Sequence, residues 1–212
     1  RGWNPLLLLW GVVAMLACGV VLEPLMQLVD FDFLPMPDPG RGGWALMTSV
    51  VAAPLFEELL CRGVVLESLR VRSGVLTAWI GSSLFFGVMH LHPAQSLNAF
   101  VLGLLFGFLC LQTRSLWPSL LLHAFNNALA LLMIWAEFPG ANFDGRPMAE
   151  LTLRELIGNG RLYAAVYAAA LLVVAVSGVE MVRRMRRLRA QERKNAAEAA
   201  INPAPDTLNS GK

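Results

Sequence analysis

The chain has 212 residues, of which 56% are hydrophobic and only 15% are charged. Soluble domains carry about 25% charged residues, so this composition excludes an ordinary soluble domain and predicts an integral membrane protein. The formal net charge is only +2, and the sequence contains no Gly-rich phosphate loop and no nucleic-acid-binding pattern. We therefore expect the lipid bilayer to be a partner of this chain, and we expect no nucleic acid.

Six apolar stretches approach the length of about 20 residues that a membrane-crossing helix needs. They run approximately over 5–29, 44–69, 75–91, 95–113, 116–136 and 162–182. Helices are expected because lipid offers no partner to an unpaired backbone group. The predicted fold class is therefore all-α, a polytopic transmembrane bundle of about six membrane-spanning helices.

An arginine-rich segment after the sixth stretch predicts the orientation in the membrane. It carries Arg183, Arg184, Arg186, Arg187, Arg189, Arg193 and Lys194, and blocks of this kind stay in the cytoplasm. An even number of crossings then places the N-terminus in the cytoplasm as well, together with the turns that hold Arg70 and Arg114. The acidic residues Asp30, Asp32 and Asp38 fall in an outer loop. We expect a multi-pass protein of the bacterial inner membrane with both termini in the cytoplasm.

Two adjacent glutamates and an arginine interrupt the second apolar stretch. A charge at the centre of a bilayer costs about 2.5–3.5 kcal/mol on insertion scales, so charges kept there are expected to have a function. Glu58 and Arg62 lie one helical turn apart and can form an ion pair. This pairing leaves Glu57 to point into a cavity, where a carboxylate suits a general base acting on water. The alternative is a charge network with a structural role only.

Further polar residues interrupt the third and fifth stretches. His123 and Asn127 are one turn apart and share a face of the fifth helix. Their N–H groups could stabilise an oxyanion, or they could bind neighbouring helices together. Asn126 faces elsewhere and fits the second role better. A lone histidine at the position of His90 is more typical of the membrane interface, and His92 is expected to lie there or in a loop.

These residues form three motifs that occur in order on successive apolar stretches: Glu57-Glu58-x-x-x-Arg62, Phe86-x-x-x-His90 and His123-x-x-x-Asn127. Together the motifs resemble those of the CAAX protease and bacteriocin-processing family, also called Abi, which includes the type II CAAX prenyl endopeptidases. The resemblance covers approximately residues 44–136, a four-helix catalytic core.

The resemblance implies a glutamate-type intramembrane peptidase that acts on a membrane-associated peptide or protein, which could be lipidated or otherwise tethered to the membrane. Glu57 would activate water with the help of His90, while His123 and Asn127 would form the oxyanion hole. The rest of the first motif would hold Glu57 in place. The candidate catalytic residues are therefore Glu57, Glu58, Arg62, His90, His123 and Asn127.

The predicted helix limits make the convergence of these residues difficult. They place Glu57 near the middle of the membrane, His90 towards the outer end of its helix and His123 nearer the inside. The three can meet if the third helix extends past residue 91, if it is tilted, or if the cavity is deep.

Three alternative functions remain open. Glu57 or Glu58 with His90 and His123 makes a two-histidine, one-carboxylate set for zinc, although no His-Glu-x-x-His helix occurs. We expect no cofactor and keep a zinc-dependent protease as the alternative. The same side chains would suit a proton-coupled transporter, although no inverted repeat is evident. A non-enzymatic scaffold or immunity protein is the third possibility.

The expected organisation follows from these assignments. Residues 1–43 hold the first transmembrane helix and an outer loop, and 44–136 form the catalytic core. Residues 137–161 form an outer loop, and 162–194 form the last transmembrane helix with its basic cytoplasmic end. We expect 195–212, rich in Ala, Asn, Pro and Ser, to be a disordered tail.

Overall fold

The computed structural model describes residues 5–29, 40–136 and 151–201, and these residues form helices joined by short turns, without a strand. The predicted all-α fold class is confirmed. The acidic positions expected in the first outer loop lie outside the described residues.

Five consecutive helical segments join end to end between residues 43 and 73, and six further helices complete the fold. The first five are α2 (Gly43–Leu46), η1 (Met47–Ala52), α3 (Ala53–Glu58), η2 (Leu59–Leu66) and α4 (Glu67–Ser73). The others are α1 (Pro5–Val29), α5 (Val75–Val88), α6 (Pro93–Thr113), α7 (Trp117–Trp135), α8 (Leu153–Ile157) and α9 (Gly160–Ile201). The η segments are π-helices, a form that is rare and often found at functional sites.

Among the described residues, four helices are long and apolar enough to cross a membrane: α1, α6, α7 and the part of α9 from Gly160 to Glu198. The shorter α5 is also apolar. The run from α2 to α4 is the predicted second stretch, now divided by its two π-helical segments. The chain is thus an all-α membrane bundle.

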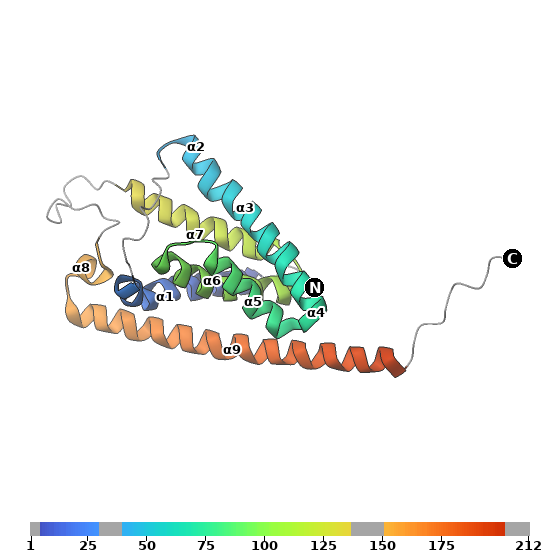
Figure 1. The fold of residues 1–212 in the computed structure, drawn as a ribbon. Coiled ribbons are helices and arrows are strands. Elements are labelled where there is room, and N and C mark those ends of the chain that lie inside the picture. The colour runs from blue at the N-terminus through green and yellow to red at the C-terminus, as the bar shows by residue number, and fades with distance from the viewer. Residues whose placement is uncertain (1–4, 30–39, 137–150, 202–212) are drawn as a thin grey trace.

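Helix α6 forms the centre of this bundle. Its side chains Phe106, Phe108 and Leu109 are almost fully buried, and α1, α5 and α7 all pack against it. In Figure 1, α9 runs along one side of the bundle and continues beyond it, while the α2–α4 run slants across the other side next to α7.

Glycine allows α5 and α6 to approach closely. A Cβ atom on Gly103 of α6 would lie 3.1 Å from the Cα and 3.2 Å from the Cβ of Ser83 on α5. Distances of this kind are tighter than ordinary van der Waals contact, so a larger residue at 103 would push the two helices apart.

The third predicted stretch ends earlier than expected. Helix α5 stops at Val88, and Leu91 has a φ of 57°, in the left-handed region that ends a helix. Of the three ways in which the site residues could meet, the extension of this helix past residue 91 is therefore ruled out, and His90 lies in the turn before α6.

The last helix is longer than predicted. Helix α9 continues to Ile201, so residues 195–201 are helical and the expectation of a disordered tail from residue 195 is wrong for them. Alanine is the best helix former, and Lys194 and Glu198 form an ion pair of 3.7 Å one turn apart. Residues 202–212 lie outside the described part of the chain.

The segment expected to be an outer loop contains the short helix α8. Thr152 and Glu155 form a capping box at its N-terminus. The carboxylate of Glu23, a charge inside the apolar α1, accepts a hydrogen bond of 2.5 Å from the N–H of Leu153. An anion at a helix N-terminus is stabilised by the helix dipole, so α8 gives Glu23 a partner.

Candidate active site

A buried ion pair lies at the centre of the candidate site. Arg62 Nη1 donates to Glu58 Oε1 at 2.9 Å, and both side chains are almost fully excluded from solvent. The prediction that these residues pair is confirmed. Arg62 Nη2 also donates to the carbonyl of Gly103 at 3.1 Å, so the arginine attaches the helix carrying the glutamates to α6.

Two aromatic rings enclose the same guanidinium group. Its Cζ atom lies 4.5 Å from the ring centroid of Phe86 and 5.5 Å from that of Phe106. Cation–π contacts of this kind are worth about 2 kcal/mol or more when desolvated. Arg62 is thereby fixed by one carboxylate, one carbonyl and two rings.

His123 on α7 lies between the two glutamates. Its Nδ1 atom is 3.0 Å from Glu58 Oε1, and its Nε2 atom is 3.6 Å from Glu57 Oε2. Its ring stacks on Phe106 with centroids 5.1 Å apart and contacts the edge of Phe86 at 5.4 Å. The structure thus brings His123 to the glutamates, a contact that the spacing of the motifs did not predict.

The two glutamates differ in exposure. The side chain of Glu57 is 26% exposed, whereas that of Glu58 is 1% exposed. Glu58 accepts from both Arg62 and His123. The prediction that Glu58 is engaged and Glu57 remains accessible agrees with these contacts.

His90 joins the site through an aromatic neighbour. Its Nδ1 atom lies 2.8 Å from the carbonyl of Phe86, and its ring contacts the edge of the Phe86 ring with centroids 4.9 Å apart. Phe86 therefore contacts both candidate histidines. The imidazole that lies next to Glu57 in this structure is that of His123, not that of His90.

The two asparagines of α7 contact each other and the π-helical segment η1. Asn127 Nδ2 donates to the carbonyl of Ser49 at 3.0 Å, and Asn126 Nδ2 lies 3.4 Å from Asn127 Oδ1. Asn127 thus binds two helices together, one of the two roles left open. The expectation that Asn126 faces away from His123 stays a prediction.

His92 is the N-cap residue of α6. It lies in a turn, as predicted, but its side chain is buried. His92 therefore does not lie at an exposed interfacial position.

Sequence reasoning missed Gly103, Phe106 and Ser49 as parts of the site. Two of them contribute backbone carbonyls, for which the residue type gives no signal. Phe106 is one of many aromatic residues in apolar stretches, and nothing in the sequence distinguishes it from the others.

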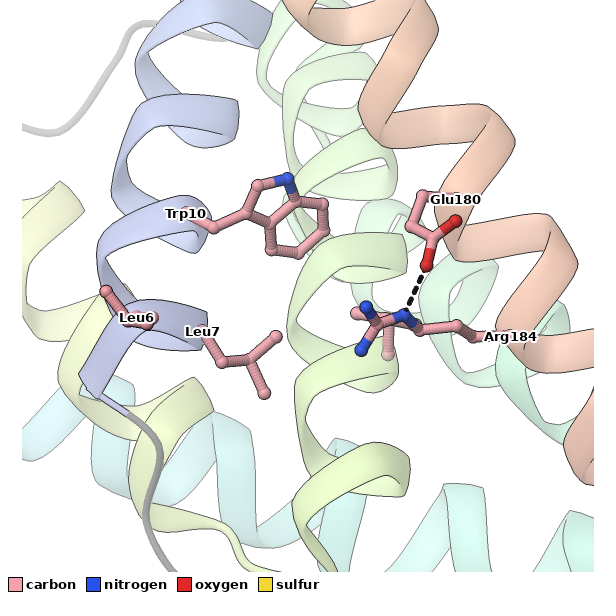
Figure 2. A pocket seen from close by; sticks show the side chains of 6 residues that line it. Leu6, Leu7, Trp10, Glu180 and Arg184 are labelled. Carbon is pink, nitrogen blue, oxygen red and sulfur yellow. Dashed lines mark hydrogen bonds and ion pairs between the residues drawn. The ribbon is translucent and has the colours of Figure 1, made fainter.

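Two cavities lie away from the Glu57–His123 contact. One, of about 240 Å³, is lined by Leu7 and Trp10 of α1 on one side and by Glu180 and Arg184 of α9 on the other, with the last two forming an ion pair (Figure 2). The other, of about 430 Å³, has three arginines in its wall: Arg62, Arg70 and Arg114. The basic residues of these turns thus lie at one end of the bundle.

The zinc alternative requires three ligands in one place. Within the described residues, no group of three or more His, Cys, Asp or Glu side chains comes together in an arrangement that could hold a metal ion.

Comparison with known proteins finds similarity in the part of the chain that carries the candidate site. Residues 40–129 match the family described as type II CAAX prenyl endopeptidase Rce1-like. A protein of Bacillus subtilis (strain 168) named "Putative membrane peptidase YdiL" is 25% identical over 88 residues. That alignment covers 42% of this chain and 36% of the relative. No solved structure matches the chain. All three motifs lie inside the matched segment, and the predicted resemblance to the CAAX protease and bacteriocin-processing family is confirmed.

Proposed function

We propose that this chain is an intramembrane endopeptidase that hydrolyses a peptide bond of a membrane-associated peptide or protein. The observation that carries the proposal is the position of His123, which lies between an accessible glutamate and a buried one. The family of the helical core supports the reaction class.

Glu57 is the proposed base, because it is the less buried of the two carboxylates, with a side chain that is 26% exposed against 1% for Glu58. It takes a proton from water as the oxygen attacks the carbonyl carbon of the scissile bond. A separation of 3.6 Å between its Oε2 and His123 Nε2 is too long for a hydrogen bond. Such contacts often tighten when substrate binds.

Glu58 is the proposed orienting group. When its carboxylate accepts the Nδ1–H of His123, the Nε2 atom is left to face Glu57. A proton can then pass between Glu57 and this nitrogen, and from there to the leaving amine. Arg62 pairs with Glu58 at 2.9 Å and balances its charge.

Stabilisation of the tetrahedral intermediate is proposed to come from Asn127. One N–H of its amide donates to Ser49, and an amide nitrogen has a second N–H that can donate to the oxyanion. We propose that His90 completes the site from the turn after α5, where it shares the activation of water with Glu57.

We propose that the reaction requires no metal or other cofactor, because a glutamate, an imidazole and an amide donor suffice for it. The proposed substrate is a tethered or lipidated peptide, because the site lies among membrane-embedded helices. We also propose that the chain resides in a bacterial inner membrane with both termini in the cytoplasm.

The test is cleavage by purified protein in detergent, with a pool of membrane-tethered and lipidated peptides as substrate. Wild type is compared with Glu57→Gln and with Glu67→Gln, in which the same change is made at an exposed carboxylate of α4. Cleavage by wild type and Glu67→Gln but not by Glu57→Gln supports the proposal. Equal cleavage by all three proteins would overturn the role of Glu57, and cleavage by none would favour a scaffold or carrier.

A further inference from the structure

The carbonyl of Ser49 has no donor within its own helix. In a π-helix each N–H bonds to the carbonyl five residues earlier, and the N–H of Ala53 donates to Thr48 in this way. In the same pattern, the carbonyl of Ser49 would accept a hydrogen bond from the N–H of residue 54. That residue is Pro54, which has no N–H.

The same proline explains why the helix widens at this place. In an α-helix the ring of Pro54 would clash with the carbonyl of Val50, four residues earlier, and would leave that carbonyl without a donor. The π-helical spacing of η1 shifts the missing bond by one residue, onto Ser49.

A side chain from another helix supplies the missing donor. Asn127 Nδ2 on α7 lies 3.0 Å from Ser49 O. An unsatisfied backbone group in lipid costs several kcal/mol, so this bond matters to both helices. Asn127 lies one turn from His123 on α7, and Pro54 lies one turn before Glu57 and Glu58 on α3.

We propose that Pro54 is a positioning residue of the site. By removing the helical donor of Ser49, it creates an acceptor that only a partner helix can satisfy. Asn127 binds this acceptor and so fixes α7, with His123, against the helix that carries the glutamates. The positioning role rests on the proposed function. The energetic coupling between Pro54 and Asn127 does not, because it is expected whether or not the protein cleaves peptides.

The coupling can be measured with a double-mutant cycle. Asn127→Ala is made in wild type and in Pro54→Ala, whose new N–H can donate to Ser49, and each protein is unfolded reversibly in mixed detergent micelles. In wild type, Asn127→Ala should raise the ratio of unfolded to folded protein roughly tenfold, because it strands a carbonyl. In the Pro54→Ala background the same change should raise it less than about threefold. Equal effects in both backgrounds would overturn the proposal.

A matched control is available in α1, which contains Pro24 within its apolar helix. Pro24→Ala also adds an N–H to a transmembrane helix, but it should leave the effect of Asn127→Ala at the wild-type value.

Pro54 is fully buried, so Pro54→Leu serves as a second background that restores the N–H and keeps an apolar side chain.

A spectroscopic test needs no change at Pro54. Protein labelled with ¹³C at the serine carbonyls is compared with its Asn127→Ala variant by infrared spectroscopy, and the Ser49 band is isolated by subtracting spectra of the Ser49→Ala protein. The band should move to higher frequency in Asn127→Ala, because Ser49 then has no donor. An unmoved band would show that Ser49 has a donor in its own helix and would overturn the proposal.

If cleavage is established, a positioning role for Pro54 also predicts a specific change in the kinetics of the Pro54→Ala variant. Pro54→Ala should lower kcat while leaving KM near the wild-type value, because it loosens the helix that carries His123 without touching substrate. A wild-type kcat in Pro54→Ala would separate this contact from catalysis and overturn the positioning role, while leaving the proposed peptidase intact.

Discussion

His123 Nδ1 lies 3.0 Å from Glu58 Oε1, although the two residues are 65 positions apart in the sequence. The same oxygen of Glu58 accepts from Arg62 Nη1 at 2.9 Å. One buried carboxylate oxygen thus accepts hydrogen bonds from Arg62, on the α2–α4 run that also carries Glu58, and from His123 on α7. This arrangement makes Glu58 the structural centre of the site, and Glu57 is the proposed base.

His123→Ala should abolish most cleavage while leaving the protein folded. General acid–base groups contribute about 10²- to 10⁴-fold to rate, and the variant removes the imidazole nearest Glu57. The fold should persist because Arg62 still balances the charge of Glu58. The measurement is turnover of the tethered peptide together with circular dichroism. Leu121→Ala, at an exposed position of α7, is the control, and wild-type turnover in His123→Ala would contradict the proposed mechanism.

Arg62→Ala should damage folding and yield. It strands the buried Glu58 carboxylate, and removal of one partner of a buried ion pair costs roughly 3–5 kcal/mol. Arg62→Lys should recover only part of this loss, since one ammonium group cannot reproduce the guanidinium geometry that reaches both Glu58 and the Gly103 carbonyl. Unfolding in mixed micelles measures the difference. An Arg62→Ala protein with wild-type stability would show that the ion pair is not needed for folding.

Chelators should leave cleavage unchanged if the reaction uses no metal. The check is turnover after treatment with EDTA or 1,10-phenanthroline, with the metal content of the purified protein measured in parallel. Loss of activity that stoichiometric zinc restores would replace the metal-free mechanism with a zinc-dependent one.

The sequence predicts the helices, and it predicts the Glu58–Arg62 pair because both residues lie on one helix, where spacing alone determines which side chains meet. The His123–Glu58 contact joins two helices, and its geometry depends on how they pack. Spacing within α7 could place His123 and Asn127 on one face, but it could not show that the imidazole would lie between two carboxylates.

Helix ends were harder to predict for a similar reason. Apolar composition continues past Val88, yet α5 ends there because the chain turns before the proline that opens α6. For residues 195–201, the composition predicted disorder. The structure has a helix there, which ends at Ile201 and is stabilised by alanines and by the ion pair between Lys194 and Glu198. The family resemblance proposes the site residues from the order of the motifs and does not depend on these boundaries.

The extension of α9 is attached to α4 by an ion pair that the sequence did not predict. Arg70 Nη2 lies 2.7 Å from Glu192 Oε1, with both side chains about one-third exposed. Arg70→Ala should therefore cost little, about 0.2–1 kcal/mol, but should raise hydrogen exchange in the basic end of α9. The double variant Arg70→Glu, Glu192→Arg should restore protection, and a difference from wild type that persists in the swap would show that the pair does not hold this helix.

Gly103→Ala should impair the site without changing any polar side chain. The new Cβ would lie 3.1 Å from Ser83 Cα and 3.3 Å from Phe86 Cδ1, so α6 must move away from α5 and take with it the carbonyl that binds Arg62. Overpacking of this kind typically costs about 1–3 kcal/mol. Gly63→Ala is the matched control, because nothing lies within 4 Å of its added Cβ. We expect lower stability and turnover in Gly103→Ala and wild-type behaviour in Gly63→Ala. Equal behaviour of the two variants would mean that the contact between α5 and α6 does not position Arg62.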